Sequence, residues 1–165
     1  NLLGPSPVYM PKDAVPQIFI AIESEHAENS SGAPLSIGAV RSDSNAFVYG
    51  RWPLKIKNCS QWTLMQVVPQ LESTAVPADV ALDTLVQWRE DEPTAVLWAG
   101  EEAVALWLAH RYNLHCEVWP GPRSEYESIQ LWWCAQQWLD TNPRYHALWD
   151  ARGMLAQWEK STAVD

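Results

Sequence analysis

The sequence has few cysteines, no long apolar run and no targeting segment. Its three cysteines, Cys59, Cys116 and Cys134, are odd in number and lack Cys-x-x-Cys spacing, which favours reduced thiols in a cytoplasmic protein. The longest apolar runs, such as residues 18–22, are far shorter than the roughly 20 residues that a transmembrane helix needs. No segment has the layout of a secretory signal peptide. We therefore expect a cytoplasmic protein without a membrane partner.

Positive charge is also scarce. Eleven Lys and Arg oppose 20 Asp and Glu, which gives a net charge of −9, and no basic run occurs. Because affinity for nucleic acids comes largely from basic side chains that neutralise phosphates, this balance argues against a tight non-specific DNA binder. It does not exclude a nuclease, whose metal ions would supply positive charge locally.

Apolar residues, in contrast, are plentiful enough for an ordinary globular core: 47% of the 165 residues are hydrophobic and 11 are Trp. Residues 1–16 carry four prolines and predict an extended N-terminal arm, and residues 17–165 predict a single domain. Strands are expected at residues 17–23, 34–41, 45–52, 94–98 and 115–119. Helical spacing of apolar residues predicts helices after Pro77 and over residues 104–112, 126–133 and 148–158, with room for another near 61–71.

This order, three strands and then alternating helices and strands, predicts an α/β fold. We expect a mixed sheet in which a β-meander is followed by βαβ units, with helices on its faces.

Four short segments, the first two of which belong to one motif, follow one another in a recognisable order. Residues 18–23 are IFIAIE and residues 35–40 are LSIGAV, residues 96–100 are VLWAG, and residues 145–152 are YHALWDAR. In this order they resemble the motifs of the DEDD (DnaQ-like) 3′–5′ exonuclease superfamily, and most closely its exodeoxyribonuclease branch often found in phages. In that family the first strand ends in Asp-x-Glu, the next is close to ISIGAV, and the third motif is His-x-Ala-Leu-x-Asp-Ala. The resemblance covers nearly the whole chain after residue 16.

The resemblance implies an RNase H-like fold and a metal-dependent hydrolase site. In the family, four carboxylates hold two divalent ions, Mg²⁺ or Mn²⁺, about 4 Å apart, and the ions activate water and stabilise charge on the phosphate. A His, or a Tyr in a sister group, orients or deprotonates that water.

The carboxylate set is incomplete in this chain. The family's Glu falls on Glu23 and its last Asp on Asp150. Its first Asp falls on Ala21, and its second-motif Asp falls on Ala105 in an ungapped alignment. Since hard cations need several oxygen ligands, two carboxylates of four would hold a divalent ion poorly.

The position of the general base is also altered. Tyr145 stands where the main group has His, and His146 stands where the sister group has Tyr. Nearby, Glu101 and Glu102 are expected in the first turn of a helix, where the helix dipole favours acids. They are also the only nearby acids that could replace the missing Asp as metal ligands.

Each of these residues also has a purely structural interpretation. Glu23 could be a strand-end carboxylate that faces water, and Asp150 could cap or solvate its helix. His146 lies four residues before Asp150 and could form a surface pair with it. Three tryptophans near element ends, Trp52, Trp62 and Trp119, are candidates for exposed aromatics that would stack on bases or join a protein interface.

We therefore expect an exonuclease-like domain that has lost catalysis, a pseudo-nuclease that binds a protein or a nucleic-acid end without a cofactor. One alternative is an active metal-dependent 3′–5′ exonuclease with Glu23, Asp150 and either Glu101 or Glu102 around Mg²⁺ or Mn²⁺. Another is an interaction domain in which this groove no longer matters. The sequence leaves open the partner, the choice between DNA and RNA, the oligomeric state and whether Ala21 is natural.

Overall fold

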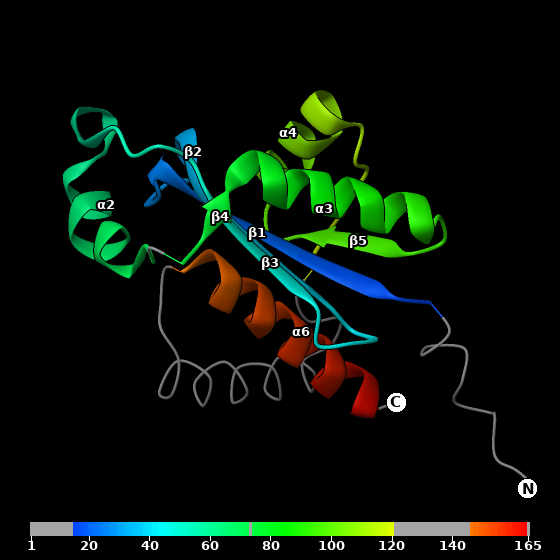
Figure 1. Cartoon of the computed structure of the whole chain (residues 1–165). Helices are drawn as coiled ribbons and strands as arrows, with labels where there is room; N and C mark the ends of the chain where they lie inside the picture. The colour runs from blue at the N-terminus through cyan, green and yellow to red at the C-terminus, as the bar shows by residue number, and fades with distance from the viewer. Residues whose placement is uncertain (1–14, 73, 121–145, 165) are drawn as a thin grey trace, which may run out of the picture.

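A computed structural model describes residues 15–72, 74–120 and 146–164 (Figure 1). Its centre is a six-stranded sheet in the order β4-β3-β2-β1-β5-β6. The strands are β1 Gln17–His26, β2 Ser31–Arg41, β3 Phe47–Arg51, β4 Val76–Pro77, β5 Val96–Ala99 and β6 Glu117–Val118. The first three form an antiparallel meander, whereas β5 is parallel to β1 and β6 is parallel to β5. The predicted α/β class and mixed sheet flanked by helices are confirmed.

Strand β1 lies inside the sheet, between β2 and β5, and is covered on both faces. Successive side chains of a strand point to opposite faces. Ile18 and Ile20 therefore join the core cluster of one face, and Phe19 and Ala21 join that of the other. Burial on both sides explains why this segment is apolar without alternation.

Helices α3 (Ala78–Asp91) and α4 (Glu102–Tyr112) cover one face of the sheet (Figure 1). Leu82 and Leu85 of α3 and Leu108 of α4 pack into the same apolar cluster with β1, β2 and β5. We call this the α3/α4 face.

Helix α6 (Ala147–Val164) covers the other face, the α6 face. Its start rests directly on β2 at Gly38. A Cβ atom at Gly38 would lie 2.4 Å from both the Cα and the N of Leu148, which is too close for any side chain. The glycine of the LSIGAV segment therefore sets how closely α6 approaches the sheet.

The boundaries differ from expectation mainly between residues 24 and 33 and between 56 and 77. The β1–β2 hairpin continues to the pair His26↔Ser31, past register shifts that follow Glu23. The helix expected near residues 61–71 is a short α2 (Gln61–Gln66), followed by a 3₁₀ turn, η3 (Val68–Gln70). Pro69 explains the break, because proline has no N–H for helical bonding. The turn η2 (Ile56–Asn58) and strand β4 were not expected from the sequence.

Some predictions fall outside the described residues: most of the N-terminal arm, the helix over residues 126–133, Tyr145 and Cys134. Among the helices within the described ranges, none is both long and apolar enough to cross a membrane.

Candidate functional site

The candidate site lies where the carboxyl ends of β1 and β5 meet. Parallel pairing places Ile20 beside Ala99, and the N–H of Gly100 donates to the carbonyl oxygen of Ile20 at 3.2 Å. From this point β1 continues to Glu23, and the chain after β5 enters α4 through Glu101. In sheets of this type the carboxyl ends of adjacent parallel strands form the usual binding crevice.

Glu23 of β1 and Asp150 of α6 are hydrogen-bonded to each other at this edge. Burial raises the pKa of Glu23 to about 10, and the hydrogen bond with Asp150, the charge of Asp150 and the charge of Glu101 add to the increase. A carboxyl group with this pKa is protonated at neutral pH.

Burial also raises the pKa of Asp150, whereas the hydrogen bond from Glu23 and the charge of His146 oppose that increase. Asp150 lies in the first turn of α6, where the helix dipole favours a negative charge. The two acids titrate as one pair. The raised pKa values indicate that the pair retains a proton at neutral pH, held between the two carboxyl groups.

Of the two glutamates at the start of α4, Glu101 is the one that acts on the pair. Its charge contributes to the raised pKa of both Glu23 and Asp150. Glu101 precedes the first turn of α4 and makes no capping hydrogen bond through its side chain, whereas Glu102 is the first-turn acid. Both side chains are exposed.

The two alanines at the missing-acid positions lie on opposite faces of the sheet. Ala21 is buried on the α6 face, two residues before Glu23 and therefore on the same side of β1. Ala105 is buried in the α3/α4 cluster with Leu108. The structure does not bring Ala105 to the carboxylate pair, so the ungapped alignment is a poor guide there, because it ignores which side of α4 faces the core.

His146 is buried rather than on the surface, which corrects the expected surface pair with Asp150. Its Nε2 lies 2.5 Å from Oε2 of Glu72. Its ring stacks on Tyr49 at a centroid distance of 4.6 Å and an interplanar angle of 24°. Its Nδ1 is buried and has no partner among the described residues. The imidazole therefore directs its one bonded nitrogen toward Glu72. Tyr145, the other candidate for the general base, lies outside the described residues.

Glu72 and Tyr49 are the residues near the site that sequence reasoning missed. Glu72 lies in an irregular segment between η3 and β4, and no local pattern ties it to a residue 74 positions later. Tyr49 belongs to a short apolar strand, where aromatic residues are common, so the sequence gives no reason to assign it to a site. Only the fold reveals either contact.

The three tryptophans expected to be exposed are all half-buried. Trp52 packs edge-on against Trp107, and Trp119 packs edge-on against Phe19 and Trp98. These contacts place two of the three against core aromatics rather than on an open stacking platform.

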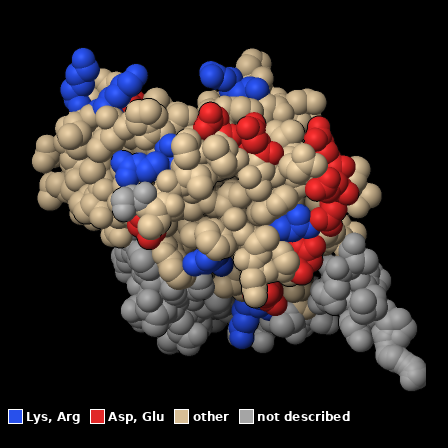
Figure 2. Space-filling model, viewed as in Figure 1, with Lys and Arg blue, Asp and Glu red and all other residues tan. Residues whose placement is uncertain are grey.

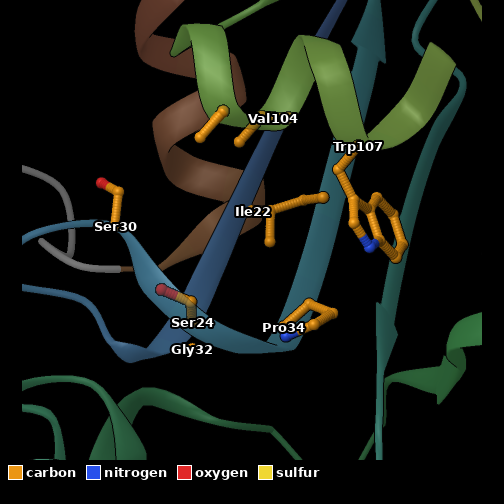
Figure 3. A pocket seen from close by; sticks show the side chains of 8 residues that line it. Ile22, Ser24, Ser30, Gly32, Pro34, Val104 and Trp107 are labelled. Atoms are coloured by element: carbon orange, nitrogen blue, oxygen red, sulfur yellow. The ribbon is translucent and has the colours of Figure 1, made fainter. Parts of the chain in front are cut away.

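A separate pocket of about 120 Å³ lies on the α3/α4 face, between the β1–β2 hairpin and α4 (Figure 3). Ile22, Pro34 and Trp107 form most of its apolar wall. Ile22 points away from the side occupied by its neighbour Glu23, as expected for successive residues of a strand. None of the candidate catalytic or metal-binding residues lines this pocket.

The oxygen donors at the candidate site do not match a two-metal centre. Within the described part of the chain, no three His, Cys, Asp or Glu side chains gather in a geometry that could hold a metal ion. Glu23 and Asp150 point their oxygens at each other and share a proton, and Ala21 supplies no ligand. The residues present therefore do not fit the pair of ions that the family resemblance implies.

No protein-family model matches the chain, and no curated protein sequence matches it.

Proposed function

We propose that this chain is an RNase H-like domain of the DEDD exonuclease type that no longer hydrolyses nucleic acid. In this proposal it acts as a binding module, either for another protein or for the end of a nucleic acid. The observation that carries the proposal is the Glu23–Asp150 pair, two acids from the first and last motifs that share a proton at one sheet edge.

The topology supports the fold part of the proposal. A meander of β1 to β3 is followed by β5 and β6, which are parallel to β1. This is the order that the resemblance implies. The packing of α6 on Gly38 gives a reason for the matching glycine, and it brings the third-motif acid to the first.

The donor count supports the loss of catalysis. The first-motif Asp would fall on Ala21, on the same face as Glu23, and alanine offers no oxygen. A divalent ion would have to displace the shared proton and would gain few ligands in exchange.

Charge supports a weak affinity for nucleic acid. The chain has a net charge of −9. On the face seen in Figure 2, Lys and Arg side chains are scattered, and Asp and Glu side chains gather along the side where α3 ends. A polyanion would meet repulsion rather than a continuous basic path.

An active metal-dependent 3′–5′ exonuclease is the second candidate, and one observation favours it. The charge of Glu101 acts on both members of the pair, and in this candidate Glu101 would take the place of the second-motif Asp as a third acid. Mg²⁺ or Mn²⁺ would be the ion.

A nuclease assay separates the two candidates. Purified protein is incubated with single- and double-stranded DNA and RNA in Mg²⁺ or Mn²⁺, with Glu23→Gln as the control variant. We expect no degradation above that of Glu23→Gln. Metal-dependent degradation that Glu23→Gln abolishes would establish the active enzyme instead.

A further inference from the structure

The outer edge of β3 is open over most of its length. β2 pairs with β3 from Phe47 to Arg51, but on the other side β4 pairs only with Gly50 and Arg51. In this parallel register the position beside Tyr49 belongs to Ala75, which precedes β4 and lies outside the strand. Within the described ranges, no strand pairs with the outer side of residues 47–49.

A groove of about 580 Å³ runs along this open edge. Phe47, Val48 and Tyr49 all line it, although consecutive strand residues point to alternate faces. Val80 and Thr84 of α3 form one wall, and helix α6 forms the other. Figure 1 looks toward this edge, with β3 between α3 and α6. The floor of the groove is therefore a strand edge, and its two walls are helices.

Helix α6 contributes the groove's positive charge. The Arg152 guanidinium lies 4.5 Å from the ring centroid of Trp149 and 5.2 Å from that of Phe47. Arg152 makes no ion pair with another described residue, so aromatic rings hold it in place while its charge remains available. A second groove beyond Phe47 shares both Phe47 and Arg152, so the surface continues past the end of β3.

The rest of the lining is mostly apolar and includes Val76, Val80 and Leu148, and Phe47 is 52% exposed. The one acid among the described lining residues is Glu72, whose carboxylate already contacts the imidazole of His146. An exposed strand edge with apolar side pockets is the surface to which extended peptides add as a further strand: backbone hydrogen bonds give affinity and alternate side chains give specificity.

We propose that this groove binds an extended segment of a partner protein, which adds to β3 as an edge strand beyond β4. The segment has alternating apolar side chains, and an acidic residue pairs with Arg152. This inference names the class of partner for the binding role proposed above. It rests on the proposed function only in assuming that the chain is a binding module. The surface lies at the opposite edge from β5 and β6 and does not use the Glu23–Asp150 pair.

A random linear peptide library displayed on phage, selected on the folded full chain, tests the inference. We expect the enriched peptides to carry alternating apolar residues and an Asp or Glu. The best peptide is then synthesised with a fluorophore, and its Kd is measured by anisotropy. Arg152→Glu, which reverses the charge, and Thr84→Arg, which fills the α3 wall, should each weaken binding at least tenfold.

The matched control is Arg111→Glu, the same charge reversal at an exposed position near the end of α4, which should leave the Kd within twofold. Circular dichroism of every variant checks that it is folded. Glu23→Gln should also leave the Kd unchanged, so a nuclease-positive result would overturn the silent site without affecting the groove.

Backbone methylation of the peptide tests strand addition itself. N-methyl groups at alternate residues whose N–H faces β3 should abolish binding, whereas N-methyl groups at the residues between them should not. Hydrogen exchange should show new protection of those amides among residues 47–49 whose N–H groups point away from β2. Lack of enrichment after repeated selection, binding indifferent to both groove variants, or displacement of the peptide by a single-stranded oligonucleotide would each overturn the proposal.

Discussion

The two faces of the sheet are closed by different chemistry. The α3/α4 face is filled by aliphatic side chains such as Ile20, Leu82 and Leu108. The α6 face combines small apolar contacts at Ala147 and Ala151 with buried or half-buried polar groups. The stability of the α3/α4 face depends on how well apolar side chains fill its volume. The stability of the α6 face also depends on the protonation of its polar groups and on any metal ion that competes with those protons.

The comparison extends to how closely the helices approach. α6 needs the bare backbone of Gly38 because the backbone of Leu148 lies against it, and two residues further along the helix Asp150 is hydrogen-bonded to Glu23. Residues that hold α6 against the sheet therefore contribute both to stability and to the position of Asp150.

The largest expected effect comes from adding a side chain at Gly38, where α6 touches the sheet. Gly38→Ala places a Cβ against the backbone of Leu148, which cannot move aside without shifting the helix. We expect a loss of about 4 kcal/mol in the free energy of unfolding, measured by urea titration. Gly100→Ala is the matched control, because its Cβ would meet only Met154 at 3.5 Å or more. Equal stability of the two variants would contradict the packing of α6.

The next effect distinguishes the two faces by charge. Ala105→Asp buries a carboxylate in the aliphatic α3/α4 cluster, and we expect it to cost about 3 kcal/mol. Because Ala105 does not face the site, Mn²⁺ should not restore the lost stability. The exposed substitution Ala103→Asp, on the same helix, should change stability by less than about 0.5 kcal/mol. Strong rescue of Ala105→Asp by Mn²⁺ would show that residue 105 belongs to the site after all.

A smaller effect concerns the shared proton. The folded pKa of Glu23 is about 10, above its ordinary value of 4.5. The folded state therefore holds a proton that the unfolded state releases, and stability should fall as pH rises between those two values.

In the variant Glu23→Gln the side-chain amide can still donate a hydrogen bond to Asp150, but residue 23 no longer titrates. Its unfolding free energy should fall less steeply with rising pH than that of the wild type, so the difference between the two proteins should be small at pH 5 and grow toward pH 9. Urea unfolding across this range measures both. Parallel pH profiles for the two proteins would contradict a protonated Glu23.

The smallest effect is at His146. His146→Phe retains the stacking on Tyr49 and removes the buried, unpartnered Nδ1, but it loses the contact with Glu72. Since Glu72 is half exposed, these changes nearly cancel, and we expect less than about 1 kcal/mol of change in stability. Thermal unfolding checks this, and a loss as large as that of Gly38→Ala would require a further buried partner for the imidazole.

The sequence predicted most of the sheet because its strands carry strong local signals. The apolar run of β1 and the helix after Pro77 depend on neighbouring residues, and both are confirmed. β4 was missed because two residues have no periodicity, and their pairing with β3 is a long-range contact.

The candidate site was predicted in part for the same reason. Glu23 and Asp150 could be matched to motifs, and the structure brings them together. The side of α4 that faces the core decides the role of Ala105, and a motif alignment contains no such information. The contact of His146 with Glu72 depends on a loop whose path follows from tertiary packing.

The most direct test of the silent site is the response of the melting temperature to Mn²⁺ in the wild type and in Ala21→Asp. The substitution adds an acid on the face of Glu23, so mutual repulsion and burial should lower the melting temperature without metal. Millimolar Mn²⁺ should raise it again, because the ion binds only the folded form. We predict that Mn²⁺ leaves the wild type nearly unchanged. Stabilisation of the wild type by as much as Ala21→Asp would show that Glu23, Asp150 and Glu101 already form a working metal site.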